Sequence, residues 1–281
     1  MNTPHTIQAL LDSAYHRLQR FESARLDAEI LLSAVLNTGR EYLYAHPEHA
    51  LASEAIIDFN SLINKRSQGY PIAYLTGIKE FWSIPLIVNR HTLIPRPETE
   101  LLVETALDRI PVDQDLNILD LGTGCGAIAI AIARERPNIT VIATDISHDT
   151  LATASENAYR HGLKNIQFKH SDWFSELDRY TFHIIVSNPP YVESGNHNLV
   201  ESEIRYEPRL ALDGGHQGLQ AFTQIIPAAV RYLSANGCLL LEHGANQGEM
   251  VRRILKDNHY YDIQTINDYS GQERISFGYI P

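Results

Sequence analysis

Residues 117–136 read NILDLGTGCGAIAIAIARER, and this stretch carries the strongest fold signal in the chain. The apolar run at 117–121 predicts a strand, and the small apolar residues from Ala127 onward predict a helix. Gly122, Gly124 and Gly126 stand between them, where glycine permits a sharp turn close to a ligand and the helix N-terminus offers free N–H groups. We therefore predict a ligand-binding loop, although a purely structural turn or a dinucleotide fingerprint ending at Ala127 also fits.

Further apolar strands are expected downstream of this loop, each followed by a helical stretch. The expected strands cover residues 139–144, 166–170, 182–187 and 238–242. Strands that alternate with helices predict a parallel sheet covered on both faces. The ending, 261–266 and 274–279 across a short polar link, predicts an antiparallel pair. The fold class is therefore α/β, with a seven-stranded Rossmann-like sheet over residues 98–281.

The first 73 residues have a different pattern, since their apolar residues recur at helical spacing. Helices are expected over residues 7–18, 26–39 and 53–69, the first of them capped by Thr3 and Pro4. Residues 74–97 are rich in β-formers interrupted by Ser83 and Pro85. We predict a helical bundle over 1–73 and a β-hairpin linker over 74–97.

The overall composition excludes several classes of protein. Lys and Arg number 23 against 34 Asp and Glu, a net charge of −11, so direct nucleic-acid binding is not expected. Cys125 and Cys238 are too few for a disulfide framework or a cysteine-based zinc site, and no metal is predicted. The apolar run at 127–133 is too short to span a membrane, and the N-terminus lacks a secretion signal. We expect a cytoplasmic protein.

Polar residues follow the next two expected strands. Asp145, 23 residues after Gly122, is placed to accept hydrogen bonds from ribose hydroxyls. Its alternative role is to cap the following helix, but Ser147 is the better placed cap. Asp172 could accept an adenine amino group and Trp173 could pack on its ring, unless the aromatic residues there only close the end of the sheet.

The sequence Asn188-Pro189-Pro190-Tyr191 follows the fourth expected strand. An amide or aniline-like NH₂ is a poor nucleophile, so a site that alkylates it must orient its lone pair. The Asn188 side-chain oxygen and the Pro189 carbonyl can each accept one N–H, while Pro190 stiffens the turn and Tyr191 offers a flat face. A simple proline-rich turn is the alternative. Glu242 and His243 are interpreted as a polar strand end, not as a catalytic base.

The chain resembles the bacterial peptide chain release factor glutamine methyltransferases of the HemK type. The resemblance extends over nearly the whole length, through the glycine loop, residues 187–191, and the segments DAEILL at 27–32, PIAYLTG at 71–77, LIPRPETE at 93–100 and EPRLAL at 207–212. Residues 96–100, together with the helical N-terminal domain, narrow the match to this family.

The resemblance implies methyl transfer from S-adenosylmethionine to the side-chain nitrogen (N5) of the glutamine in the GGQ motif of class-one release factors. The residues expected to contact the cofactor are Gly122, Thr123, Gly124, Cys125, Gly126, Asp145, Asp172, Trp173 and Asn188. The residues expected to bind the glutamine are Asn188, Pro189, Pro190 and Tyr191, of which Asn188, Pro189 and Tyr191 are assigned to catalysis. The helical domain is expected to help recognise the release factor.

Three other functions fit parts of the pattern. An adenine-N6 methyltransferase would use the same acceptors on a DNA or RNA base, but the negative charge and the lack of a basic recognition region oppose it. An NAD-dependent oxidoreductase would leave residues 188–191 unexplained. A non-catalytic module that binds release factors would have no use for them.

Overall fold

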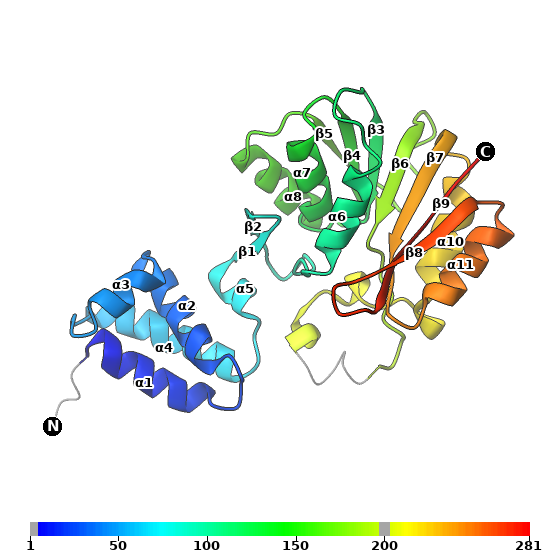
Figure 1. Cartoon of the computed structure of the whole chain (residues 1–281). Helices are drawn as coiled ribbons and strands as arrows, with labels where there is room; N and C mark the ends of the chain where they lie inside the picture. Colours follow the sequence, from blue (N-terminus) through cyan, green and yellow to red (C-terminus); the bar gives the residue numbers. More distant parts are fainter. Residues whose placement is uncertain (1–4, 197–202) are drawn as a thin grey trace. The chain divides into compact units, whose positions relative to one another are not determined.

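The computed structural model describes residues 5–196 and 203–281, which belong to two compact units (Figure 1). Of these residues, 5–77 and 203–206 belong to a helical unit, and 78–196 and 207–281 belong to an α/β unit. The chain therefore leaves the α/β unit late in its course, adds a short segment to the helical unit and returns. In the described residues, no helix is long and apolar enough to cross a membrane.

The helical unit is a small bundle with its own apolar core. Its elements are α1 (Ile7–Leu18), α2 (Ala24–Leu36), α3 (Arg40–Ala45), α4 (Ser53–Ser67), α5 (Ile72–Thr76) and the 3₁₀ turn η1 (Glu203–Tyr206). The core includes the fully buried Leu31, Leu32, Phe59 and Ile63. The N-cap of α1 is Thr6, whose side chain accepts a hydrogen bond from the Ala9 N–H, whereas Thr3 and Pro4, predicted for that role, lie outside the described residues.

A buried ion pair anchors the returning segment to this bundle. Arg66 is 3% exposed, and its Nε donates to Asp27 Oδ2 at 2.6 Å. A second nitrogen of the same guanidinium donates to Glu203. Buried charges that lose their partners destabilise a fold strongly. The segment 203–206 is therefore held to the bundle by Arg66.

The α/β unit opens with the hairpin β1 (Ile78–Phe81) and β2 (Ile84–Ile87). The elements that follow are α6 (Thr99–Leu107), β3 (Asn117–Leu121), α7 (Ala127–Glu135), β4 (Thr140–Asp145), α8 (His148–Arg160), β5 (Ile166–His170), β6 (Phe182–Ser187), η2 (Arg209–Ala211), η3 (His216–Gly218), α10 (Gln220–Ala229), β7 (Leu233–Glu242), α11 (Gly248–Asp257), β8 (Tyr261–Asn267) and β9 (Glu273–Tyr279). The predicted sheet is confirmed, with seven strands in the order β5-β4-β3-β6-β7-β9-β8. Strands β3 to β7 pair in parallel, and β9 is antiparallel to both β7 and β8.

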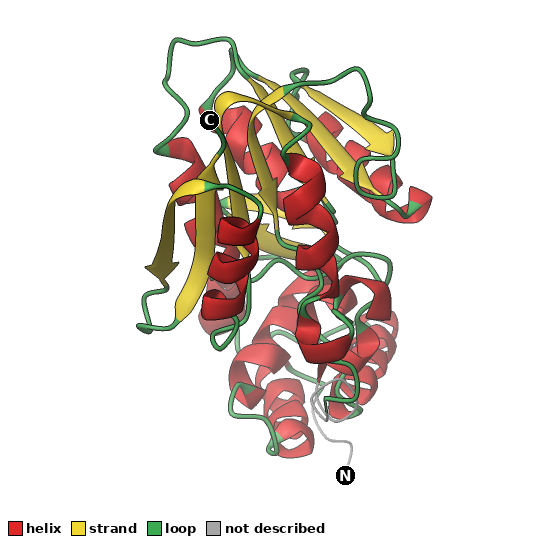
Figure 2. Ribbon diagram, turned by 90° about the vertical axis from the view of Figure 1, so that its right-hand side faces the viewer, coloured by secondary structure: helices red, strands yellow, loops and turns green. Residues whose placement is uncertain are grey.

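Helices cover both faces of this sheet, as Figure 2 shows. Alternate residues of a strand point to opposite faces. Leu119 and Leu121 of β3 belong to one apolar cluster with Phe222 of α10 and Val251 of α11. Asp120, between them, points to the other face and accepts a hydrogen bond from the Ala129 N–H of α7 at 3.2 Å. The strands are thus buried on both sides, which explains their nearly continuous apolar sequences.

The register of the central strands places the predicted loops side by side. Leu121 of β3 pairs with Thr144 of β4 and with Ser187 of β6. The next residue along each strand is Gly122, Asp145 or Asn188, so all three lie at one edge of the sheet. Ligands of open parallel sheets bind at this carboxyl edge, where the strand order reverses.

Candidate active site

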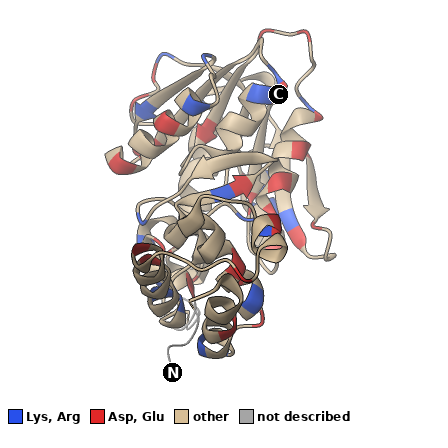
Figure 3. Ribbon diagram, turned by 90° about the vertical axis from the view of Figure 1, so that its left-hand side faces the viewer, with Lys and Arg blue, Asp and Glu red and all other residues tan. Residues whose placement is uncertain are grey.

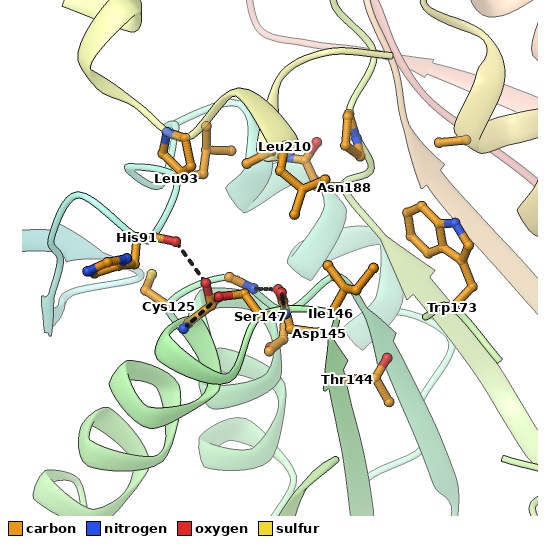
Figure 4. A pocket seen from close by; sticks show the side chains of 18 of the residues that line it. His91, Leu93, Cys125, Thr144, Asp145, Ile146, Ser147, Trp173, Asn188 and Leu210 are labelled. Carbon is orange, nitrogen blue, oxygen red and sulfur yellow. Dashed lines mark hydrogen bonds between the residues drawn. The ribbon is translucent and has the colours of Figure 1, made fainter. Parts of the chain in front are cut away.

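A cavity of about 380 Å³ lies in the α/β unit at this edge, lined by the ends of β3 to β6 and by later loops (Figure 4). Its volume is within the range of small-molecule sites. The predicted site residues that line it are Gly122, Thr123, Gly124, Cys125, Asp145, Asp172, Trp173, Asn188 and Pro190. Gly126, Pro189 and Tyr191, also predicted for the site, are not among its lining residues.

The glycine loop has a backbone that only glycine adopts easily. The φ angles of Gly122, Gly124 and Gly126 are +72°, +59° and +88°. A Cβ on Gly124 would meet no atom within 4 Å, because this residue borders the open cavity. A Cβ on Gly126 would lie 3.0 Å from Ile130 Cδ1. The loop therefore leaves space for a ligand at Gly124 and permits close helix packing at Gly126.

Asp145 joins the end of β4 to this loop. Its Oδ2 accepts from the Gly124 N–H at 3.1 Å, and its Oδ1 accepts from the Ser147 N–H at 3.0 Å. Burial raises the pKa of Asp145, and these backbone N–H donors oppose that rise. Ser147 caps α8 by accepting from the Thr150 N–H, which confirms the predicted cap. Since a carboxylate oxygen accepts more than one hydrogen bond, Asp145 keeps capacity for ribose hydroxyls.

Trp173 stands in the cavity wall with a backbone that is unusual for its residue type. Its φ is +47°, which a bulky residue adopts only when its surroundings hold it. The Ser171 hydroxyl donates to the Trp173 carbonyl at 2.8 Å, and the indole Nε1 donates to Gln224 Oε1 at 2.9 Å. A Cβ added to Gly122 would lie 3.8 Å from Trp173 Cζ3, so the indole adjoins the glycine loop. Asp172, beside it, is exposed.

The Asn188 side chain is oriented by a residue that the sequence analysis did not assign to the site. Asn188 Nδ2 donates to Thr99 Oγ1 at 3.1 Å. Thr99 is the first residue of α6 and also lines the cavity. Because the amide nitrogen is engaged with Thr99, the side-chain oxygen is the atom left to accept hydrogen bonds from a ligand. The segment 93–100, chosen above only for its family resemblance, supplies this partner.

The loop after β6 is held by a second stretch of backbone. Val192 N–H donates to the Leu212 carbonyl at 2.9 Å, and Gly214 N–H donates to the Val192 carbonyl at 2.8 Å. A Cβ on Gly214 would lie 2.7 Å from the Pro190 carbonyl oxygen, so only glycine fits there. Gln247 Nε2 donates to the Tyr191 carbonyl at 3.0 Å. The acceptor loop 188–191 is therefore fixed by its neighbours.

Two further segments complete the cavity wall. Glu207 Oε2 accepts from the Ile94 N–H at 3.0 Å, and its other oxygen pairs with Arg96. These contacts join residues 93–100 to 207–212, the two segments quoted for the family resemblance. Leu210 and Ile146 line the cavity although they are 63% and 45% exposed, so the cavity has an apolar rim. This rim could not be predicted from the sequence, because single exposed apolar residues are common on protein surfaces and do not indicate a binding site.

Glu242, at the end of β7, is 0% exposed. The Tyr191 hydroxyl donates to its Oε1 at 3.2 Å. Burial raises the pKa of Glu242 to about 7, and burial likewise raises the pKa of Tyr191. The neighbouring His243 bonds to Ser276 Oγ and to the Gly244 carbonyl, and burial lowers its pKa. Neither Glu242 nor His243 lines the cavity.

Neither nucleophilic catalysis by a cysteine nor metal catalysis is supported by the described residues. Burial raises the pKa of the Cys125 thiol to about 12, so this side chain stays protonated and is no nucleophile. Among residues 5–196 and 203–281, no group of three His, Cys, Asp or Glu side chains is arranged to hold a metal ion.

Sequence comparison finds close relatives along the whole chain. Two family models match, "PrmC N-terminal domain" over residues 9–77 and "Methyltransferase small domain" over residues 97–215. A protein of Salmonella typhimurium named release factor glutamine methyltransferase is 46% identical over 271 residues, 96% of this chain and 98% of that protein. The protein of the same name from Escherichia coli is 45% identical over 96% of this chain and 98% of that protein.

Comparison with solved structures finds the same fold at low sequence identity. A methyltransferase from Pyrococcus furiosus has a TM-score of 0.53 and 16% identity, with 78% of this chain and 96% of that chain covered. The T. thermophilus 16S rRNA N2 G1207 methyltransferase, in complex with AdoMet and guanosine, has a TM-score of 0.52 and 19% identity. The match covers 73% of this chain and 50% of that chain. At these identities the likeness shows the fold alone.

The burial of Glu242 makes the stability of the protein depend on pH. The pKa of its carboxyl is raised from 4.5 to about 7 in the folded chain, so the unfolded chain ionises first as the pH rises. The contribution of Glu242 to stability is therefore full below about pH 4.5 and is lost as the pH rises through about 7. Glutamine cannot ionise, so the variant Glu242→Gln does not lose this contribution. We expect its free energy of unfolding, relative to that of the parent, to rise by on the order of 3 kcal/mol from pH 5 to pH 8.

Urea unfolding at both pH values measures this difference. Glu104→Gln is the matched control, because Glu104 also accepts from a tyrosine hydroxyl, that of Tyr269 at 3.0 Å, but is exposed. A Glu242→Gln difference that stays constant with pH would show that the carboxyl is not perturbed.

Proposed function

The chain belongs to the release factor glutamine methyltransferase family, and from this premise we propose which of its residues carry out the reaction and on which release factors they act. The protein is an S-adenosylmethionine-dependent enzyme that methylates a glutamine of a release factor. Identity of 46% along nearly the whole length supports this, together with an asparagine oxygen left free at the edge of a ligand-sized cavity.

The cavity fits the cofactor. A loop that keeps open space at Gly124, a carboxylate at Asp145 and an indole at Trp173 correspond to the polar and flat parts of S-adenosylmethionine. Asp145 would accept the ribose hydroxyls, the glycine loop would let the backbone approach closely, and Asp172 and Trp173 would bind the adenine. When bound, the cofactor supplies an electrophilic methyl group on a positively charged sulfur.

The chain's own part in the reaction is to orient a poor nucleophile. We assign the Asn188 side-chain oxygen and the Pro189 carbonyl as acceptors of the two N–H bonds of the glutamine amide. The nitrogen lone pair then faces the electrophile, and Pro190, which lines the cavity, packs against the planar amide. Tyr191 does not line the cavity, and its hydroxyl donates to the buried Glu242, so its part is to hold the loop in place. Methyl transfer leaves the amide nitrogen positively charged, and this cation is strongly acidic, so it loses one proton to water and gives the neutral N-methyl amide. No side chain is required as a general base.

The identity of the protein substrate can be stated more finely as a proposal. We propose that the target is the glutamine of the GGQ motif in class-one release factors, that the helical unit helps to recognise them, and that the enzyme works in the cytoplasm, where they act. Figure 3 shows Lys and Arg interspersed with Asp and Glu along the ribbon. With a net charge of −11, this distribution favours a protein substrate over a nucleic acid.

Asp145→Ala is expected to weaken S-adenosylmethionine binding roughly 10- to 100-fold, because it removes a charged acceptor and frees the Gly124 N–H that the carboxylate holds. Isothermal titration calorimetry measures the affinity. Glu156→Ala is the control, since Glu156 forms a surface ion pair with Arg160 on α8. Unchanged affinity of the Asp145 variant, or tight binding of NAD by the parent, would refute the cofactor assignment.

Labelled S-adenosylmethionine, offered with a purified class-one release factor and with duplex DNA, tests the function directly. We expect the release factor to take up the label and the DNA to remain unlabelled.

Asn188→Ala is expected to lower the single-turnover rate roughly 100-fold through misorientation of the amide, with little change in release-factor affinity. Labelled DNA would overturn the proposed function, and a parent rate in Asn188→Ala would overturn the positioning mechanism.

A further inference from the structure

Gln224 of α10 lines the cavity but has no part in the mechanism above. Its Oε1 accepts the N–H of the Trp173 indole at 2.9 Å, and both residues line the same cavity. Its neighbours on α10, Phe222, Ile225 and Ile226, are each 0% exposed. The helix is therefore fixed in the core, and it carries an amide to the cavity wall at a defined place.

The backbone of Trp173 is held in a conformation that a bulky residue seldom adopts, with a φ of +47°. The hydroxyl of Ser171, which is 2% exposed, donates to the Trp173 carbonyl at 2.8 Å. Strained backbone of this kind persists only where the surroundings hold it, and it is concentrated at ligand sites. The main chain is fixed in this way, and the orientation of the ring is left to the contacts of the side chain.

The indole has two broad orientations about its outer side-chain torsion, related by a half turn. In the observed one, Nε1 reaches Gln224, and the six-membered ring adjoins the glycine loop, where a Cβ on Gly122 would lie 3.8 Å from Trp173 Cζ3. Figure 4 shows the indole nitrogen on the side of the ring away from Asp145. A half turn would exchange the two edges and take the N–H from its acceptor. The hydrogen bond to Gln224 therefore selects one of the two orientations.

The exposure of Gln224 bears on what this hydrogen bond does. Because the side chain is exposed, water can replace the amide as acceptor for the indole N–H, and the fold loses little stability without it. A water molecule is not attached to α10, however, and does not hold the ring at one place. The amide of Gln224 thus contributes to the direction of the ring more than to the stability of the fold.

We propose that Gln224 is a positioning residue whose side-chain oxygen holds the Trp173 indole in the orientation that receives the adenine of S-adenosylmethionine. This inference rests on the proposed function, because the orientation of the ring matters only if the adenine packs on it. It assigns no contact between Gln224 and the reacting atoms. The role of the amide is to accept one hydrogen bond from a fixed helix.

Calorimetric titration of the full-length enzyme with S-adenosylmethionine tests this proposal. Gln224→Met keeps the length of the side chain without its amide oxygen, and we expect it to weaken binding roughly three- to tenfold. Gln224→Glu keeps an acceptor oxygen and should bind within about threefold of the parent. Thr223→Ala is the matched control, because Thr223 is exposed on the same helix and does not line the cavity. It should bind as the parent does.

A double-mutant cycle distinguishes positioning from direct contact with the cofactor. Trp173→Phe keeps a flat ring but has no N–H to donate. If Gln224 acts through the indole, adding Gln224→Met to Trp173→Phe should cause no further loss of affinity. An equal loss from Gln224→Met in both backgrounds would show that Gln224 acts on the cofactor without Trp173, and would overturn the proposal.

Fluorescence reports the ring itself without any ligand. The chain has two tryptophans, and Trp82 does not line the cavity, so Trp82→Phe leaves Trp173 as the only indole. In that background we expect Gln224→Met to lower the fluorescence anisotropy of Trp173, because the ring is released, and Gln224→Glu to restore it. Unchanged anisotropy in Gln224→Met would contradict the positioning role.

The parent and Trp173→Ala separate the two levels of the account. A parent that binds S-adenosylmethionine, with Gln224→Met binding equally well, would contradict only the role of Gln224. Parent affinity in Trp173→Ala would contradict the packing of the adenine on Trp173, and the proposal with it. A parent that does not bind S-adenosylmethionine would contradict the function itself.

Discussion

At the centre of the sheet, Leu121 of β3 lies between Thr144 of β4 and Ser187 of β6, and the parallel pairing of these strands sets the position of everything in the site. Each strand ends at this level, and each continues into a polar loop. A shift of one residue in either pairing would turn the side chains to the wrong face and separate the glycine loop from Asn188. The apolar residues of α10 and α11 that pack against the strands oppose such a shift.

Two buried carboxyls support the two halves of the site. Asp120 is 0% exposed and accepts from the Thr123 hydroxyl at 2.6 Å and from the Ala129 N–H, so it fixes the glycine loop against α7. Burial raises its pKa to about 7, as it does that of Glu242. Each carboxyl has one oxygen without a hydrogen-bond partner. The fold thus gives up some stability at both places to hold a loop in one conformation.

The sequence was sufficient to predict the sheet, the glycine loop, the Ser147 cap and the family, because each of these has a local signal in residue type or period. Thr99 was not predicted to belong to the site, and Glu242 was interpreted only as a polar strand end. The hydrogen bond from Asn188 to Thr99 joins residues 89 positions apart, and that from Tyr191 to Glu242 joins residues 51 apart, so no periodicity reports them. Helix α6 was also missed, since it is buried on several sides and lacks an amphipathic stripe. Nothing local indicates that residues 203–206 join the helical unit.

The central claim is that the Asn188 side-chain oxygen, held by Thr99, accepts the N–H of the substrate amide. A neutron diffraction structure of the enzyme with S-adenosylhomocysteine and a release factor would test it most directly, because neutrons distinguish an amide NH₂ from its oxygen. The account predicts that the Asn188 NH₂ faces Thr99 and that the glutamine nitrogen lies about 2.7 to 3.2 Å from both Asn188 Oδ1 and the Pro189 carbonyl oxygen. An Asn188 oxygen directed to Thr99, or a glutamine that presents its carbonyl to this loop, would contradict it.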